Sequence, residues 1–144
     1  MKQARIFLQL YALAHIAGGL LLPWLTDSII FAEYNHALAA AFGLSDEACA
    51  SQARFLTGLM GPTIASWGIL MLLTVSEAFA RPSAKWWWGL ILAGLLWAPY
   101  DSFLSWQHGI YLNIPINAAS LAALLVPLWL VRHNFLHIPH STSS

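Results

Sequence analysis

The stretch WWWGLILAGLLWAPYDSFLSWQH, residues 86–108, decides how the chain is interpreted. It is long and apolar enough to form a helix across a membrane, which needs about 20 mainly apolar residues. It also carries a carboxylate, Asp101, near its far end. Charged side chains are costly in hydrocarbon and, where they occur, usually mark a functional position. Asp101 is therefore the first candidate for a functional residue.

The composition of the whole chain agrees with a membrane location. Its 144 residues are 59% hydrophobic and only 8% charged, whereas soluble domains carry roughly 25% charged residues. We therefore predict a single integral membrane domain over residues 1–144. The net charge of zero gives no basis for nucleic-acid binding. The single cysteine, Cys49, excludes an internal disulfide and a multi-cysteine metal site, and no metal or cofactor is predicted.

Four apolar segments predict four membrane spans. They cover about residues 6–25, 54–76, 86–106 and 111–131, and the second lies within a longer helix from about 46 to 80. The only long connection contains an amphipathic piece at 29–42, which is typical of a helix on the membrane surface or over a bundle. The predicted fold is an all-α, antiparallel four-helix transmembrane bundle with an extracytoplasmic amphipathic lid between the first two spans.

The charged residues predict the orientation. With four spans, one side of the membrane receives Lys2, Arg5, Arg81, Lys85 and Arg132. The other side receives Arg54 together with Asp27, Glu33, Asp46 and Glu47. Because basic residues stay in the cytoplasm, both termini are predicted to be cytoplasmic and the protein to lie in the inner membrane.

Small residues predict how the helices pack. In the second span Gly58, Gly61, Ala65 and Gly68 recur at three- and four-residue spacing, which forms a face that another helix backbone can approach closely. The two adjacent glycines at 18–19 offer a similar contact surface on the first span. Gly89 and Gly94 share no face at their spacing and receive less weight.

Polar residues are predicted to gather in the outer half of the bundle. Trp97, Asp101 and His108 lie along one stripe of the third span, and Asn113 and Asn117 share a face of the fourth. Arg54 enters the second span from the same side and is the obvious ionic partner for the carboxylate. His15 and Tyr11, one turn apart, lie deeper on the first span, and Trp67 and Trp97 are the tryptophans best placed to line a cavity.

This pattern gives a set of candidate site residues. Asp101 and His15 are the candidate catalytic residues, and the candidate ligand-binding residues are Tyr11, Arg54, Trp67, Trp97, His108, Asn113 and Asn117. A structural interpretation competes with it. An Asp101–Arg54 pair can serve as a clamp, the asparagines as hydrogen bonds between helices, and His15 as an interior histidine with its polar groups satisfied.

The segments RFLTGLMGPTIASWGIL (54–70) and DSFLSWQHGIYLNIPIN (101–117) resemble small uncharacterised bacterial membrane proteins of four spans. The architecture is also similar to the EXPERA group, which includes sterol isomerases and receptors for lipophilic ligands. In those isomerases, acidic and histidine side chains move protons beside a sterol in a tryptophan-lined cavity. The resemblance implies comparable parts for His15, Trp97, Asp101 and Asn117. The order and spacing of the acidic residues differ, so the similarity is one of architecture.

Three functions fit these observations. The first is a site for a lipid or another lipophilic small molecule, used for binding alone or for isomerase-like acid/base chemistry. The second is an accessory subunit that stabilises a larger membrane complex, and the third is a small proton-coupled transporter that works as an oligomer. A homo-oligomer and a partner membrane subunit both remain open at this point.

Overall fold

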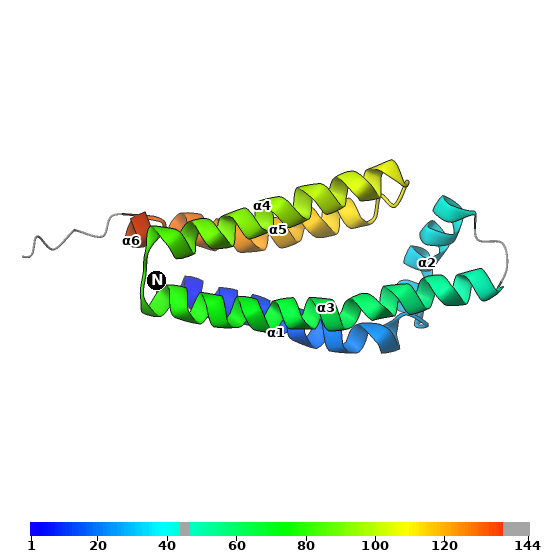
Figure 1. Ribbon diagram of the computed structural model, residues 1–144, viewed down its shortest axis with the longest axis horizontal. Coiled ribbons are helices and arrows are strands. Elements are labelled where there is room, and N and C mark those ends of the chain that lie inside the picture. Colours follow the sequence, from blue (N-terminus) through cyan, green and yellow to red (C-terminus); the bar gives the residue numbers. More distant parts are fainter. Residues whose placement is uncertain (44–46, 137–144) are drawn as a thin grey trace, which may run out of the picture.

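The computed structural model describes residues 1–43 and 47–136. Every regular element in these residues is a helix (Figure 1): α1 (Lys2–Leu25), α2 (Ile29–Phe42), α3 (Glu47–Ala80), α4 (Ala84–Gln107), α5 (Asn113–Leu130) and α6 (His133–Leu136). α1 and α4 run away from the end that holds the N-terminus, and α3 and α5 return to it. The predicted all-α class is confirmed, and the predicted helices agree with α1, α3, α4 and α5 to within a few residues. Asp46 lies outside the described residues.

The helices α1 and α3 form a close antiparallel pair through small residues. A Cβ atom on Gly19 would lie 2.5 Å from the backbone nitrogen of Ala65, and one on Gly61 would overlap the carbonyl oxygen of Gly19. Gly68 is also confined, since a Cβ atom there would lie 2.9 Å from a backbone nitrogen of α1. The predicted glycine face of α3 is confirmed. On α1 only Gly19 takes part, because a Cβ atom on Gly18 would have nothing within 4 Å.

The helices α4 and α5 form the second pair, a hairpin whose connection contains Gly109 at a φ of 74°. Side chains of α5 pack directly onto Gly94, where a Cβ atom would lie 2.7 Å from the Leu124 side chain. Gly94 thus matters more for packing than its spacing in the sequence indicated. At the other end of the hairpin, Nε1 of Trp87 donates a hydrogen bond of 3.1 Å to the carbonyl of Leu128. This bond satisfies one of the last carbonyls of α5, which have no partner within the helix.

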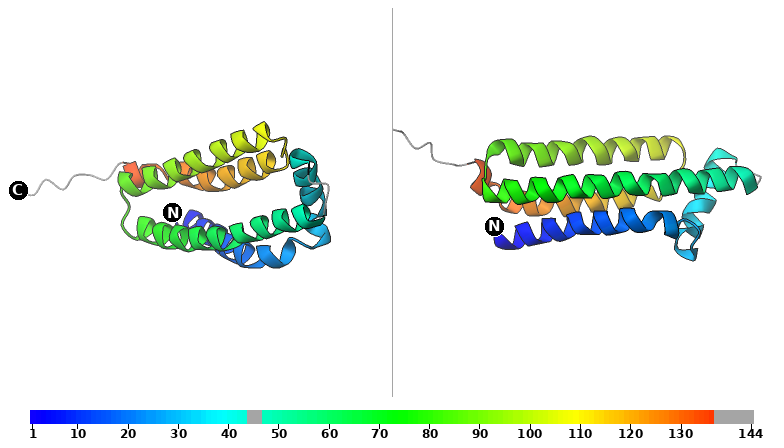
Figure 2. Two further views of the ribbon diagram at one scale, coloured as in Figure 1. Left: turned by 45° about the vertical axis from the view of Figure 1, so that its right-hand side comes forward. Right: turned by 60° about the horizontal axis from the view of Figure 1, so that its bottom comes forward.

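The two pairs meet in a hydrophobic core that lies toward the N-terminus and α6. Its fully buried side chains include Leu8 of α1, Val75 of α3, Leu128 of α5 and Phe135 of α6. The views in Figure 2 place the ends of these helices together near the N-terminus. Large apolar side chains are exposed at the opposite end, among them Phe55, Leu59, Phe103 and Ile116, and also on the outer surface at the core end, as at Leu10 and Leu73. The core therefore holds the pairs together mainly in one half of the molecule.

The amphipathic segment predicted at 29–42 is the helix α2. It crosses the end of the molecule away from the termini (Figures 1 and 2). Asn35 ties it to the end of α1 by donating a hydrogen bond of 2.7 Å to the carbonyl of Thr26. At its own end, Phe42 lies against His108, with 5.5 Å between the ring centroids. α2 thus contacts both helix pairs, and none of its residues is buried.

Three helices of the described chain, α1, α3 and α5, are long and apolar enough to cross a membrane. The many exposed leucine, isoleucine and tryptophan side chains on their surfaces fit a hydrocarbon environment. α4 is as long as α1, at 24 residues, but it is not one of these three helices. The fold places the basic residues predicted on one side together at the end that holds the N-terminus and α6: Lys2, Arg5, Arg81, Lys85 and Arg132.

Candidate functional site

Arg54 does not pair with Asp101, contrary to the expectation from the sequence. Its Nε lies 3.0 Å from Oδ1 of Asp27, and its Nη2 lies 2.8 Å from Oε1 of Glu47. The reason is the pairing of the helices, because α3 packs along α1 while α4 packs along α5. The start of α3 therefore faces the α1–α2 connection, and both acidic partners of Arg54 come from that side.

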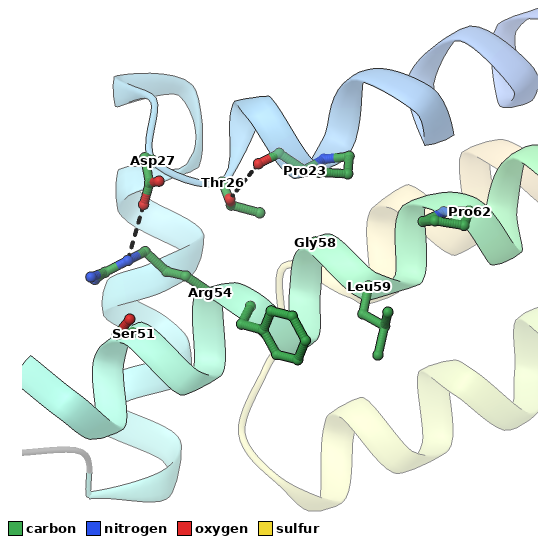
Figure 3. A pocket seen from close by; sticks show the side chains of 9 residues that line it. Pro23, Thr26, Asp27, Ser51, Arg54, Gly58, Leu59 and Pro62 are labelled. Atoms are coloured by element: carbon green, nitrogen blue, oxygen red, sulfur yellow. Dashed lines mark hydrogen bonds and ion pairs between the residues drawn. The ribbon is translucent and has the colours of Figure 1, made fainter.

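Arg54 lines a pocket of about 410 Å³ between the end of α1 and the start of α3 (Figure 3). The other lining residues are Pro23, Thr26, Asp27, Ser51, Phe55, Gly58, Leu59 and Pro62. None of the remaining candidate residues contributes to this lining. Since two carboxylates already neutralise the guanidinium, the pocket offers little attraction for an anion.

Asp101 is held by α5. The amide nitrogen Nδ2 of Asn117 lies 2.6 Å from Oδ2 of Asp101 and 3.2 Å from Oγ of Ser102. Asn117 is only 4% exposed, and Asp101 is half-buried. One turn further out, Nδ2 of Asn113 donates a hydrogen bond of 3.0 Å to Oγ of Ser105. The two asparagines thus share the predicted face and connect α5 to α4.

The charge of Asp101 has no cationic partner in the described part of the chain. The ion pairs found there join Arg54 to Asp27 and Glu47, and Arg81 to Glu77. One neutral amide therefore supports the carboxylate through a single hydrogen bond to Oδ2. A carboxylate has about four acceptor positions, so Asp101 can still accept hydrogen bonds from another donor.

Four aromatic side chains form a row across the two helix pairs. The ring of His15 lies 4.4 Å from that of Tyr11 and 5.3 Å from that of Trp67, and Trp67 lies 5.8 Å from Trp97. The hydroxyl of Tyr11 lies 2.8 Å from Oγ of Ser120 on α5. The row thus contacts all four long helices. Four of the candidate residues are brought together here.

Within this row His15 and Trp97 have distinct environments. Nδ1 of His15 lies 2.9 Å from the carbonyl oxygen of Tyr11, one turn earlier on the same helix. Trp97 remains 39% exposed although it faces Trp67 of the other pair. Asp101 follows Trp97 by one turn on α4. No hydrogen bond joins His15 to Asp101 in the described structure, so the two candidate catalytic groups do not form a direct relay.

His108 lies apart from the carboxylate. It follows the last residue of α4 and stacks against Phe42 of α2. Helical spacing predicts that His108 lies on the same face of the third span as Asp101. In the structure α4 ends at Gln107, so His108 is not part of that helical face.

Two polar contacts were missed at the sequence level. Ser102 accepts a hydrogen bond from Asn117, and Ser120 shares one with Tyr11. Ser120 follows Asn117 by three residues, so helical spacing alone was a usable signal for it. No group of three or more histidine, cysteine, aspartate or glutamate side chains that could hold a metal ion occurs among residues 1–43 and 47–136.

The chemistry of this region is that of an anionic acceptor beside aromatic rings. Asp101 can accept hydrogen bonds or a proton, and the aromatic row offers apolar and π surface next to it. No model of a known protein family, no curated protein and no solved structure matches this chain.

Proposed function

We propose that this chain is a four-span protein of the inner membrane that binds a lipophilic small molecule beside Asp101. The ligand lies between the α1–α3 and α4–α5 pairs, with its polar group on Asp101 and its apolar body against Trp97 and Trp67. The four-span architecture resembles the EXPERA group and small bacterial membrane proteins. The proposal itself rests on the contacts around the carboxylate.

The membrane part of the proposal treats α4 as a fourth span. A helix of 24 residues is about 36 Å long, which is enough to cross a hydrocarbon core of about 30 Å. α4 also packs beside α5, which is apolar enough to cross a membrane. The basic residues gathered at the end with the termini support a cytoplasmic location for that end. α2 then lies on the extracytoplasmic side as a lid over the site.

One observation carries the binding proposal: Asp101 lies half-buried in an apolar helix without a cationic partner among the described residues. Such a charge is costly in hydrocarbon and is usually found where a protein handles a polar group or a proton. A ligand hydroxyl or amine would supply the missing hydrogen bond. Trp97 is 39% exposed and its ring lies beside that of Trp67, so the two tryptophans offer an accessible aromatic surface for the rest of the ligand.

The same arrangement is compatible with acid/base chemistry. Asp101 can take a proton from a ligand that is bound against it. His15 lies on the far side of the two tryptophans and does not contact Asp101, so its part would be to donate or accept a proton at another position of the same ligand. Binding without reaction uses the same contacts.

A structural role is the second candidate, and the short bond between Asn117 and Asp101 favours it. Side-chain hydrogen bonds of this kind join helices in membranes. In that case the chain is an accessory subunit, and Asp101 serves only to hold α4 against α5.

Native mass spectrometry of the purified protein, with identification of any retained molecule, tests the proposal. Wild type and Trp106→Ala should retain a stoichiometric lipophilic molecule, while Asp101→Asn and Trp97→Ala should lose it. Trp106 is the matched control because it is an exposed tryptophan of the same helix. Asparagine keeps an acceptor for Asn117 and should leave the fold intact.

The outcomes separate the two candidates. An empty wild-type monomer would refute the binding site. Loss of folded protein in Asp101→Asn, or a membrane protein that copurifies with wild type, would support the structural role.

A further inference from the structure

A second hollow lies on the α4–α5 hairpin at the end with the basic residues. It has a volume of about 490 Å³ and is lined only by apolar and aromatic side chains. Trp87 and Trp88 contribute from α4, and Val126 and Trp129 from α5. It lies at the opposite end of the hairpin from Asp101, and none of the candidate site residues lines it.

The walls of this groove are held in place by specific contacts. Trp87 is buried, and its indole donates to the carbonyl of Leu128. Trp88 packs edge-on against Trp87, with 4.7 Å between the ring centroids. Because the first wall residue is fixed by a hydrogen bond between the two helices, the groove has a defined shape.

A cation lies directly against the groove. The guanidinium carbon of Arg132 is 4.5 Å from the ring centroid of Trp129, and its Nη1 donates a hydrogen bond of 3.0 Å to the carbonyl of the same residue. Over the described ranges this is the one hydrogen bond that the side chain of Arg132 makes, and the guanidinium forms no ion pair there. Since a guanidinium has five N–H donors, most of them remain available. Lys85, near the start of α4, adds a second cation at this end.

We propose that this groove binds an anionic phospholipid, with an acyl chain along the tryptophans and the phosphate on Arg132. An apolar groove that ends at a cation matches a molecule with an apolar chain and an anionic head. Guanidinium groups bind phosphate through paired hydrogen bonds, and basic pockets between membrane helices bind anionic head groups. The site does not depend on the function proposed for Asp101.

A competition between two lipids tests this site. The full-length protein is equilibrated in mild detergent with equal amounts of dioleoylphosphatidylglycerol and dioleoylphosphatidylcholine, and the retained lipids are counted by native mass spectrometry. Wild type should prefer the anionic lipid. Arg132→Gln should reduce that preference about fivefold, which is the effect of one cation near an anionic lipid surface. Arg81→Gln, which removes an exposed cation at the same end, should leave it unchanged.

A second variant tests the groove without touching the charge. Val126→Trp should fill the hollow and reduce the retention of both lipids, because the indole would occupy the volume that the acyl chain needs. Quenching of tryptophan fluorescence by brominated phosphatidylglycerol should fall in the same variant.

Three results would overturn the proposal. The first is an equal lipid preference in Arg132→Gln and wild type, and the second is unchanged lipid retention and quenching in Val126→Trp. The third is displacement of the anionic lipid by inorganic phosphate, which would indicate an anion site without a lipid chain.

Discussion

The adjacent glycines 18 and 19 should respond in opposite ways to the same substitution. Both lie in the middle of α1, and alanine is favoured over glycine there by about 1 kcal/mol. A Cβ atom on Gly18 would have nothing within 4 Å, whereas one on Gly19 would lie 2.5 Å from the backbones of Gly61 and Ala65. Backbone cannot rotate away as a side chain can, so α1 and α3 would have to separate.

The expected magnitudes follow from these contacts. Gly18→Ala should stabilise the protein by up to about 1 kcal/mol. Overpacking costs about 1–3 kcal/mol, and the upper part of that range applies at Gly19 because the contact involves backbone. After the gain in helix propensity, Gly19→Ala should destabilise the protein by about 2 kcal/mol.

Unfolding of the two variants in a mixed detergent series, followed by circular dichroism, measures this difference. Gly89→Ala on α4 is a further control, since a Cβ atom there would also have open space around it. Equal free energies of unfolding for Gly18→Ala and Gly19→Ala would refute the argument that α1 and α3 are held together by backbone contact at Gly19.

Three other substitutions test separate contacts by the same unfolding measurement. Asn117→Ala should destabilise the protein by about 1–2 kcal/mol, because a buried amide that joins α4 to α5 is lost; an unchanged stability would contradict this bond. Trp87→Phe should cost about 1–3 kcal/mol, since it leaves the carbonyl of Leu128 buried without its donor; a neutral effect would indicate that another group satisfies that carbonyl. Arg54→Gln should change stability by less than about 1 kcal/mol, because both of its acidic partners are largely exposed; a larger loss would mean that its ion pairs are shielded from water.

The sequence was sufficient for features that depend on one helix at a time. The recurrence of Gly58, Gly61 and Gly68 predicts a packing face wherever the partner helix lies. The spacing of Asn113 and Asn117 likewise places both amides on one face of α5, and the structure has both of them bonded to α4.

Features that depend on which helices are neighbours could not be predicted in this way. Arg54 and Asp101 lie at similar depth, so the sequence allowed them to pair. No pattern in the sequence specifies the order of helices around a bundle. The structure pairs α3 with α1, so Arg54 faces Asp27 and not Asp101. The packing role of Gly94 has the same origin, because it depends on Leu124 of the helix opposite.

The distribution of packing suggests why the candidate site lies where it does. Near the termini, buried side chains from α1, α3, α5 and α6 hold the two pairs together. Toward the other end the contacts between the two pairs include those of the aromatic row and of α2. In the function proposed above, the hydrophobic core maintains the fold while the ligand binds in the opposite half. Asp101 lies in that half, where an unpaired carboxylate disturbs the core least.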